Sequence, residues 1–409
     1  MARPTVADDG LELLTGPRVE PLLRAAVEHQ GGSLHTWSLD HVDSVPEQST
    51  TATYLARIRW AHGERNELLG VSARSGDLVP SDERAEIFED GTRKVAVWLY
   101  PHDPDLAGLP RAAFPELMAE TLSGVLPRPV TGDQLRLTMI GYRPRRRAVV
   151  RVDVLDPREV FYVKVLRSKV FDDVHRRHAL LRDAGIPAPE VALATQDNLL
   201  VTRELPGAAL ARALFEPGDP CTAEELVALL DSMPATVGAL ERRPPWSDAV
   251  GHYAKMVAAT LPELADQLAR LSERIEEELA RYGGGDEPTH GDFHEGQLRV
   301  AGGRIVGMLD VDTIGPGRRA DDLACLIGHL STIQRMNARQ EAKVRDLLAR
   351  WVPVFDRRVD PVELRLRAAA VVISLATGPY RSQAPDWRTQ TVAMVRSAEA
   401  LVRQVVPDR

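Results

Sequence analysis

Two short acidic segments in the last third of the chain hold residue types that can carry out chemistry. Residues 290–297 read His-Gly-Asp-Phe-His-Glu-Gly-Gln, and residues 307–312 read Gly-Met-Leu-Asp-Val-Asp. The stretch 298–305 between them predicts a hairpin that turns at Gly302 and Gly303. Such a hairpin brings Asp292 and Asp310 to the same end of two adjacent strands. One carboxylate facing a hydroxyl and another holding Mg2+ would suit phosphoryl transfer from a nucleotide.

The two aspartates have different expected roles. Asp292 follows a glycine, which permits a tight backbone, so we predict that it is the general base facing an acceptor hydroxyl. Asp310 follows an apolar strand over 305–309 and is predicted to bind Mg2+, with the alternative that it is a turn residue at a strand end. Gln297 is predicted to give its amide oxygen to the same ion or to brace the loop.

Three further polar residues lie in the same segments. Asp292 and His294 together resemble the Asp-x-His metal ligands of metallophosphatases, but the further Asp, Asn and His clusters of such sites are missing from the sequence. We therefore expect His290 and His294 to support the loop or to contact the substrate. Asp312 is expected either to assist the metal or to hydrogen-bond the loop.

Composition narrows the class of protein. A chain of 409 residues exceeds the size of a single core, so two or three domains are expected. The net charge is −8 and the basic residues are scattered, except for a run over 143–147 that predicts a charged hairpin tip, so no nucleic-acid partner is expected. No apolar run reaches the roughly 20 residues of a membrane span, and the polar N-terminus argues against a signal peptide. Cys221 and Cys325 lie far apart, which favours a cytoplasmic protein without disulfides.

The elements predicted around the motifs form three domains. Residues 1–134 predict an α+β module with a helix near 19–27, a helix over 112–122 and strands at 33–40, 52–60, 67–73 and 94–99. Residues 135–207 have the pattern of a small kinase lobe. Its strands are predicted at 135–142, 148–155, 161–166, 191–194 and 199–203, with a helix over 171–183.

The remainder, residues 208–409, is predicted to be mostly helical apart from the motif region. Leucines and isoleucines recur at spacings of three and four over 261–279, which is typical of a long amphipathic helix. Further helices are expected to begin near Asp321, Ala338, Pro361 and Trp387.

The order of the motifs resembles the phosphotransferase family of aminoglycoside, choline and sugar kinases over roughly residues 140–330. The resemblance lies in His290, Asp292, Gln297, Asp310 and the run Asp-Asp-Leu-Ala over 321–324. It implies an α+β, bilobal protein-kinase-like fold with a β-rich N-lobe and a mostly helical C-lobe, ATP as phosphate donor and Mg2+ as cofactor. Both acidic residues of the run are expected to stabilise a helix N-terminus, and the second matches the family's structural aspartate.

Upstream segments extend the resemblance. Lys164, within Tyr-Val-Lys-Val-Leu, falls where the family's third strand carries its phosphate-binding lysine. Residues 185–190 resemble the family's link from the N-lobe helix to the next strand. Residues 200–207 resemble the hinge that holds the adenine base. This likeness implies nucleotide contacts from Thr202, Arg203, Glu204 and Leu205.

The sequence departs from the family pattern in three places. An arginine-rich stretch over 142–147 replaces the glycine-rich loop, either to contact phosphates or as a solvated tip. The glutamate that should pair with Lys164 falls near His178, so Asp172 or Asp173 is expected to position the lysine. Gln297 replaces the common asparagine. This form is similar to maltokinases and related actinobacterial sugar kinases that carry an N-terminal cap domain, and residues 1–134 would be that cap.

The sequence therefore predicts an ATP- and Mg2+-dependent phosphotransferase that acts on a hydroxyl of a small molecule, with a sugar or amino sugar favoured. Two alternatives stay open: an aminoglycoside or other antibiotic phosphotransferase, and a nucleotide-binding pseudokinase scaffold. A protein kinase is disfavoured because no Ala-Pro-Glu segment follows Asp310. Trp246, Tyr253, Tyr380 and Trp387 are candidate walls of the acceptor site, although packing is favoured for each. The oligomeric state is left open.

Overall fold

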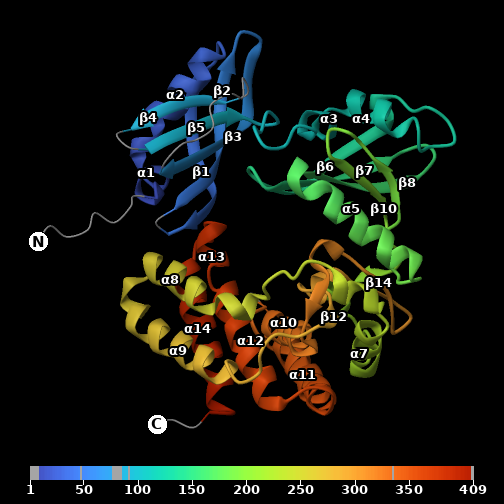
Figure 1. Cartoon of the computed structure of the whole chain (residues 1–409). Coiled ribbons are helices and arrows are strands. Elements are labelled where there is room, and N and C mark those ends of the chain that lie inside the picture. Colours follow the sequence, from blue (N-terminus) through green and yellow to red (C-terminus); the bar gives the residue numbers. More distant parts are fainter. Residues whose placement is uncertain (1–8, 47, 76–84, 91–92, 334–335, 407–409) are drawn as a thin grey trace, which may run out of the picture. The chain divides into compact units, whose positions relative to one another are not determined.

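The computed structural model describes residues 9–46, 48–75, 85–90, 93–333 and 336–406. The chain divides into two compact units (Figure 1). The first unit comprises Met1–Asp172, Val191–Arg203 and Tyr380–Pro385, and the second comprises Asp173–Glu190, Glu204–Pro379 and Asp386–Arg409. The signal-peptide expectation concerns residues 1–8, which lie outside the described residues. In the described part of the chain, no helix combines the length and apolar character needed to cross a bilayer.

The first unit begins with an antiparallel sheet in the order β1-β2-β3-β5-β4. Its strands are β1 (Ser33–Val45), β2 (Ser49–Trp60), β3 (Gly63–Ser75), β4 (Glu86–Asp90) and β5 (Arg93–Leu99). Helices α1 (Leu11–Thr15) and α2 (Glu20–His29), joined by the turn η1 (Pro17–Val19), bury Leu14 and Leu23 in one core with Ile58 and Val97. The strands β1, β2, β3 and β5 and the helix α2 lie where the sequence predicted them. The strand β4 was not predicted.

A second antiparallel sheet follows in the order β6-β7-β8-β10-β9. Its strands are β6 (Leu135–Arg143), β7 (Arg147–Val154), β8 (Glu159–Leu166), β9 (Val191–Ala194) and β10 (Leu199–Arg203). Every second residue of β7 is buried, as a half-covered strand requires. The helix α5 (Ser168–Asp183) follows β8. These elements match the small kinase lobe predicted from the sequence.

Two short helices before residue 135 cover this second sheet. They are α3 (Leu109–Ala113) and α4 (Pro115–Leu122), which place Leu109 and Met118 in one core with Val150 and Phe161. The prediction of one helix over 112–122 was wrong at its start. Phe114 is extended and Pro115 opens α4, because proline disfavours a helical conformation in the residue before it. The turn η2 (Gly132–Gln134) then leads into β6.

The second unit is mostly helical. Its longer helices are α7 (Ala223–Asp231), α8 (Val250–Thr260), α9 (Ala265–Leu279), α10 (Arg319–Ser331), α11 (Ala338–Arg358), α12 (Pro361–Leu375) and α14 (Trp387–Arg403). Shorter elements are α6 (Leu210–Ala213), α13 (Gly378–Arg381), η3 (Ala235–Ala239), η4 (Trp246–Ala249), η5 (Pro262–Leu264), η6 (Glu295–Gln297) and η7 (Val311–Thr313). The short strands are β11 (Ala208–Ala209), β12 (Glu287–Thr289), β13 (Leu298–Ala301), β14 (Arg304–Met308) and β15 (Gly315–Gly317). The helix predicted over 261–279 begins at Ala265 because Pro262 opens the separate turn η5.

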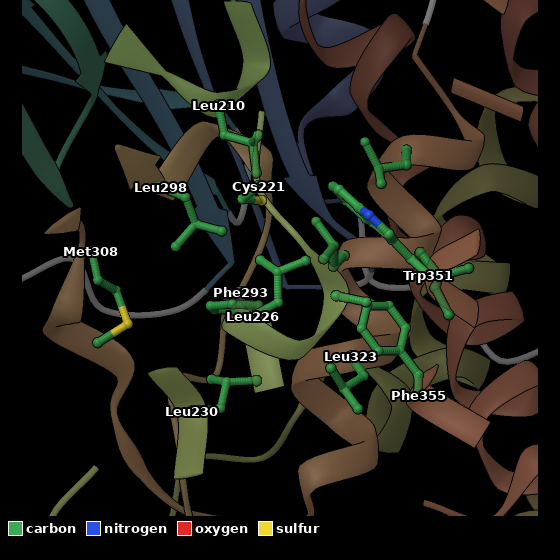
Figure 2. Packing of buried hydrophobic residues seen from close by; sticks show 14 of the residues in the cluster. Leu210, Cys221, Leu226, Leu230, Phe293, Leu298, Met308, Leu323, Trp351 and Phe355 are labelled. Atoms are coloured by element: carbon green, nitrogen blue, oxygen red, sulfur yellow. The ribbon is translucent and has the colours of Figure 1, made fainter. Parts of the chain in front are cut away.

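The first acidic segment crosses a hydrophobic core of the second unit. Figure 2 shows Phe293 close to Leu226 of α7 within this cluster, which also includes Leu323 of α10. Phe293 is fully buried, and burying a phenylalanine side chain stabilises a fold by roughly 1.5–3 kcal/mol. Since Phe293 lies between Asp292 and His294, its burial fixes the depth at which this loop sits. A separate core joins α8, α9, α12 and α14.

Candidate active site

The hairpin between the two acidic segments forms as predicted. Strand β13 pairs with β14 so that Leu298 faces Met308, and the turn residues Gly302 and Gly303 have φ values of 59° and 75°. Such positive φ values favour glycine. At the open end of the hairpin, the backbone N–H of Leu309 donates to the carbonyl of Gln297 at 2.7 Å. Gln297 and Asp310, the next residue after Leu309, therefore lie at the same end of the hairpin.

The buried side chain of His290 connects the two acidic segments by hydrogen bonds. Its ring is fully buried, with Nε2 lying 2.8 Å from the carbonyl oxygen of Leu309. The backbone N–H of Asp292 donates to Nδ1 at 3.3 Å, so the ring proton of a neutral imidazole sits on Nε2 and is donated to Leu309. The hydroxyl of Thr313 donates to the His290 carbonyl at 2.9 Å. This is a loop-supporting position, one of the two roles expected for His290.

Asp322, in the first turn of α10, holds the same loop by its backbone. Its two carboxylate oxygens accept the N–H groups of His290 and Gly291, each at 2.9 Å, and Arg319 lies 3.3 Å away. Full burial raises the pKa of Asp322, and the charge of Arg319 opposes that shift. Gly291 has φ of 82°, and a Cβ there would lie 2.8 Å from the carbonyl of Thr313. Asp322 thus lies in the first turn of its helix, as expected, and it also shapes the loop before Asp292.

Asp292 is half-buried, and its Oδ1 atom has two neighbours. The indole Nε1 of Trp246 donates to Oδ1 at 3.3 Å, and the thiol of Cys325 lies 4.0 Å from it. Burial and the charge of Asp292 raise the pKa of Cys325, which keeps this thiol protonated. In the described part of the chain, no protein donor contacts Oδ2. The two contacts thus both orient one oxygen of the carboxylate, Oδ1.

His329 of α10 joins the site and was not predicted from the sequence. Its ring stacks on that of His294 with a centroid distance of 4.0 Å and an interplanar angle of 7°. Burial and the neighbouring His294 lower the pKa of His329 to about 3, so it is neutral. The available signal was helical spacing, since residues 322, 325 and 329 share one face of α10.

These imidazoles do not form a coordination sphere as they stand. Ligand atoms of Asp292, His294 and His329 lie within 4.8 Å of one another, a donor set that transition metals accept. Stacked rings, however, direct their nitrogen lone pairs side by side, whereas a bound cation needs lone pairs that converge. The stacked imidazoles of His294 and His329 form a polar surface beside Asp292.

His294 orients Gln297. The backbone N–H of Gly296 donates to Nδ1 of His294 at 3.1 Å, so Nδ1 is an acceptor and the ring proton lies on Nε2. The side-chain amide of Gln297 lies 3.2 Å from that Nε2, and only its oxygen can accept the proton. A second lone pair of the same oxygen stays open. The adjacent Glu295 is largely buried, which raises its pKa.

Asp310 and Asp312 begin the turn after the hairpin. Asp310 adopts a left-handed conformation with φ of 49°, which aspartate and asparagine tolerate better than most residues. Asp312 is buried, with Oδ1 lying 3.5 Å from Nε2 of His178 in α5. His178, near the helix position where the resemblance places a glutamate, thus lies beside the turn that follows Asp310.

The residues expected to contact a nucleotide lie in the second sheet and just after it. Lys164 lies in β8 between Val149 of β7 and Leu200 of β10. Thr202 is buried and donates to the carbonyl of Tyr162 at 3.2 Å. Lys164 thus lies in the third strand of the second sheet along the chain, and Thr202 lies near the end of its last strand, within the segment that resembles the hinge.

The connector begins at the end of β10. Arg203 pairs with Glu159, and Glu204 is exposed. The chain passes from the first unit to the second between Arg203 and Glu204. Leu205 belongs to the second unit, where its carbonyl accepts from Arg299 at 3.3 Å.

Asp173, one of the two candidates for positioning Lys164, contacts three arginines. Its carboxylate lies 2.8 Å from Arg177, 2.8 Å from Arg243 and 2.9 Å from Arg176. These hydrogen bonds lower the pKa of Asp173 against the opposing effect of burial. The pairing of Lys164 with Asp172 or Asp173 stays a prediction.

The arginine-rich turn between β6 and β7 is held by the segment after β5. Tyr142 accepts from Nε1 of Trp98 at 2.9 Å and donates to the buried carboxylate of Asp103 at 2.7 Å. The backbone N–H of Arg145 donates to Asp103 at 2.8 Å, and its guanidinium contacts Asp105 at 2.9 Å. The base of this hairpin tip is thus fixed by residues that precede the second sheet.

Comparison with known proteins identifies the family of this chain. The model of the phosphotransferase enzyme family matches residues 146–358, and no curated protein matches the sequence. Among solved structures, choline kinase LicA from Streptococcus pneumoniae is similar at 11% identity over 69% of this chain and 98% of that chain, with a TM-score of 0.48. The macrolide 2'-phosphotransferase MphH from Brachybacterium faecium is similar at 19% identity over 72% and 99%, with a TM-score of 0.41. An ethanolamine kinase from Plasmodium vivax is similar at 13% identity over 67% and 85%, also with a TM-score of 0.41.

The family match extends over more than half of the chain and includes β8 with Lys164 and both acidic segments. The α+β fold, with a β-rich part followed by a mostly helical part, is the one that the resemblance implied. Nearness to maltokinases stays a prediction. The chain belongs to the phosphotransferase enzyme family and is a small-molecule phosphotransferase.

Proposed function

We propose that this protein transfers the γ-phosphoryl group of ATP to a hydroxyl of a sugar or amino sugar. The observation that carries the proposal is the contact between His290 and Leu309, because it joins the loop of Asp292 to the turn of Asp310. A fixed spacing between a base and a metal ligand is what phosphoryl transfer demands, since its catalysis consists mainly of positioning and electrostatics.

Asp292 is the proposed general base. The acceptor hydroxyl lies against Oδ2, which accepts the proton as the hydroxyl oxygen bonds to the γ-phosphorus. The bond from that phosphorus to the β–γ bridging oxygen breaks, and ADP leaves. The indole of Trp246 and the thiol of Cys325 contact the other oxygen, Oδ1, and keep Oδ2 directed outward.

Gln297 and Asp310 are the proposed ligands of Mg2+. An amide oxygen and a carboxylate at one end of a rigid hairpin are hard oxygen donors of the kind that Mg2+ takes. Mg2+ bound there would neutralise charge on the phosphates during transfer. Asp312 supports this turn through His178.

The nucleotide is proposed to contact the second sheet and the connector. Lys164 would pair with the α- and β-phosphates, and Thr202, Arg203, Glu204 and Leu205 would border the adenine. Because Cys221 and Cys325 are free buried thiols, we place the activity in the reducing cytoplasm. We also propose that residues 1–134 act as the cap domain, residues 135–207 as the N-lobe and residues 208–409 as the C-lobe.

A neutral, hydroxyl-rich acceptor suits the surroundings of Asp292. An indole, a thiol and the neutral imidazole of His329 contact or adjoin its carboxylate, and these groups suit the hydroxyls and the apolar face of a sugar ring. Likeness to sugar kinases with an N-terminal cap points the same way. The antibiotic alternative is tested directly by the choice of acceptors.

The test is a transfer screen with ATP or GTP, Mg2+ and a panel of sugars, amino sugars, aminoglycosides, macrolides, choline and ethanolamine. ADP release and phosphorylated product are both measured. Asp292→Asn is expected to lower kcat about 10³-fold with the best acceptor and to leave the Kd for ATP within about twofold. Asp286→Asn, at an exposed position just before β12, is the matched control and should keep wild-type rates.

Three results would contradict the proposal. Full activity of Asp292→Asn would remove the base assignment. A clear preference for an aminoglycoside or macrolide would favour the antibiotic alternative. Mg2+-dependent ATP binding without transfer to any acceptor would favour the pseudokinase scaffold.

A further inference from the structure

The indole of Trp246 lies beside the carboxylate of Asp292, although the two residues are far apart in the sequence. Trp246 opens the short helix η4 after Pro244 and Pro245. Its Nε1 donates to Oδ1 of Asp292 at 3.3 Å. A hydrogen bond to an ionised carboxylate has more effect than one between neutral groups. This one holds Oδ1 of Asp292 against the indole.

Both partners of this hydrogen bond are positioned by neighbouring residues of α10. Ser247, next to Trp246, is buried and donates to Asp321 at 3.0 Å, and Arg367 contacts both groups at 2.9 and 2.6 Å. Asp322 in turn accepts the two backbone N–H groups just before Asp292. One helical turn therefore sets the distance between the indole and the carboxylate.

Part of the indole surface is exposed to solvent. Trp246 is 36% exposed, and its ring lies 5.8 Å from that of Tyr253 at a tilt of 43°. A flat aromatic surface next to a hydroxyl-directed base suits a ring that has both an apolar face and hydroxyl edges. A pyranose has this chemistry. Stacking on the indole would present one of its hydroxyls to Oδ2.

We propose that Trp246 has two roles in the reaction: its N–H is the positioning group for Asp292, and its exposed face is the platform on which a pyranose acceptor stacks. This inference rests on the proposed function. It adds the chemical shape of the acceptor and a role for the N–H of Trp246, which the sequence offered as a candidate wall of the acceptor site with packing favoured.

The two roles separate in a pair of variants. Trp246→Phe keeps an aromatic face and loses the N–H, so kcat is expected to fall about tenfold while KM for the acceptor changes less than about threefold. Trp246→Leu loses both, so kcat falls similarly and KM for the acceptor rises about tenfold. KM for ATP should stay within about twofold in each variant, and thermal melting checks folding.

Trp60→Phe is the matched control. Trp60 lies in β2 of the first unit, and its buried Nε1 donates no hydrogen bond in the described structure. Trp60→Phe removes the same indole atoms as Trp246→Phe but breaks no hydrogen bond. Wild-type kinetic constants are therefore expected for this control.

The outcomes distinguish this inference from the proposed function. If wild type is active on a sugar and Asp292→Asn is not, but Trp246→Phe keeps wild-type kcat, the positioning role is wrong. An unchanged acceptor KM in Trp246→Leu would remove the platform. A wild-type protein that phosphorylates no carbohydrate would overturn the proposed function, and the pyranose assignment with it.

Discussion

Nε2 of His290 lies 2.8 Å from the carbonyl oxygen of Leu309, a hydrogen bond between the two acidic segments. It adds a side-chain contact to the backbone pairing of Gln297 with Leu309. The spacing between Asp292 and Asp310 is therefore fixed at two points. A buried histidine in this position works by holding two loops together and needs no contact with substrate.

This bond predicts the behaviour of His290 variants. His290→Ala leaves the Leu309 carbonyl unpaired and opens a void, so the free energy of unfolding should fall by about 2–4 kcal/mol and kcat by about tenfold or more. His290→Gln can still donate from its amide and should recover part of both losses. Urea unfolding and steady-state kinetics measure the two effects. Equal activity of the two variants would show that the hydrogen bond itself has no role.

Asp310 is predicted to matter both as an oxygen ligand and as a left-handed residue. Asp310→Asn keeps a side chain that tolerates φ of 49° but loses the charge, so activity should fall at least about 100-fold and require more Mg2+. Asp310→Ala adds backbone strain of about 1 kcal/mol and should also melt at a lower temperature. A Mg2+ titration and a thermal melt separate these effects. An unchanged Mg2+ dependence in Asp310→Asn would reject the ligand role.

Lys164 is predicted to act on the nucleotide alone. Lys164→Met keeps the length of the side chain and removes its charge, so KM for ATP should rise about tenfold or more while KM for the acceptor stays within about twofold. Lys169→Met, at an exposed position in α5, is the control and should behave like wild type. If the KM for the acceptor rose and the KM for ATP did not, Lys164 would act on the acceptor, and its nucleotide role would be wrong.

His329 predicts a pH dependence of stability. Its pKa falls from the ordinary 6.5 to about 3 in the folded chain, so below pH 6.5 the unfolded chain binds a proton that the folded chain does not. The stabilising effect of the neutral ring is thus complete above pH 6.5 and is lost as the pH falls towards 3. The loss is at most about 1.4 kcal/mol per pH unit.

Removing the imidazole should flatten that profile. In His329→Asn, the free energy of unfolding should decline less between pH 7 and pH 5 than in wild type, as measured by urea titration at each pH. His62→Asn, at an exposed position in the first unit, should keep the wild-type slope. If His329→Asn kept the wild-type slope as well, a group other than His329 would cause the pH dependence of the free energy of unfolding.

Much of the fold followed from local patterns. The alternation of apolar residues predicted the strands of the second sheet, and Gly302 and Gly303 predicted the hairpin turn, because periodicity and positive φ are properties of short segments. The errors were local too. Pro115 and Pro262 begin new helical segments where the apolar spacing alone predicted continuous helices. The strand β4 was missed because its five residues carry a weak pattern.

The residues of the site were likewise predictable only where they lie close together in the sequence. By itself the sequence determined which residue types could transfer a phosphoryl group, and their order along the chain, since Asp292, Gln297 and Asp310 lie around one hairpin. Only the tertiary structure decided what contacts them. Trp246 comes from before α8, and Cys325 and His329 come from α10; helical spacing puts these last two on one face with Asp322, but it does not show that this face lies against Asp292. Their position depends on packing between helices, which is a property of the whole core rather than of any short segment.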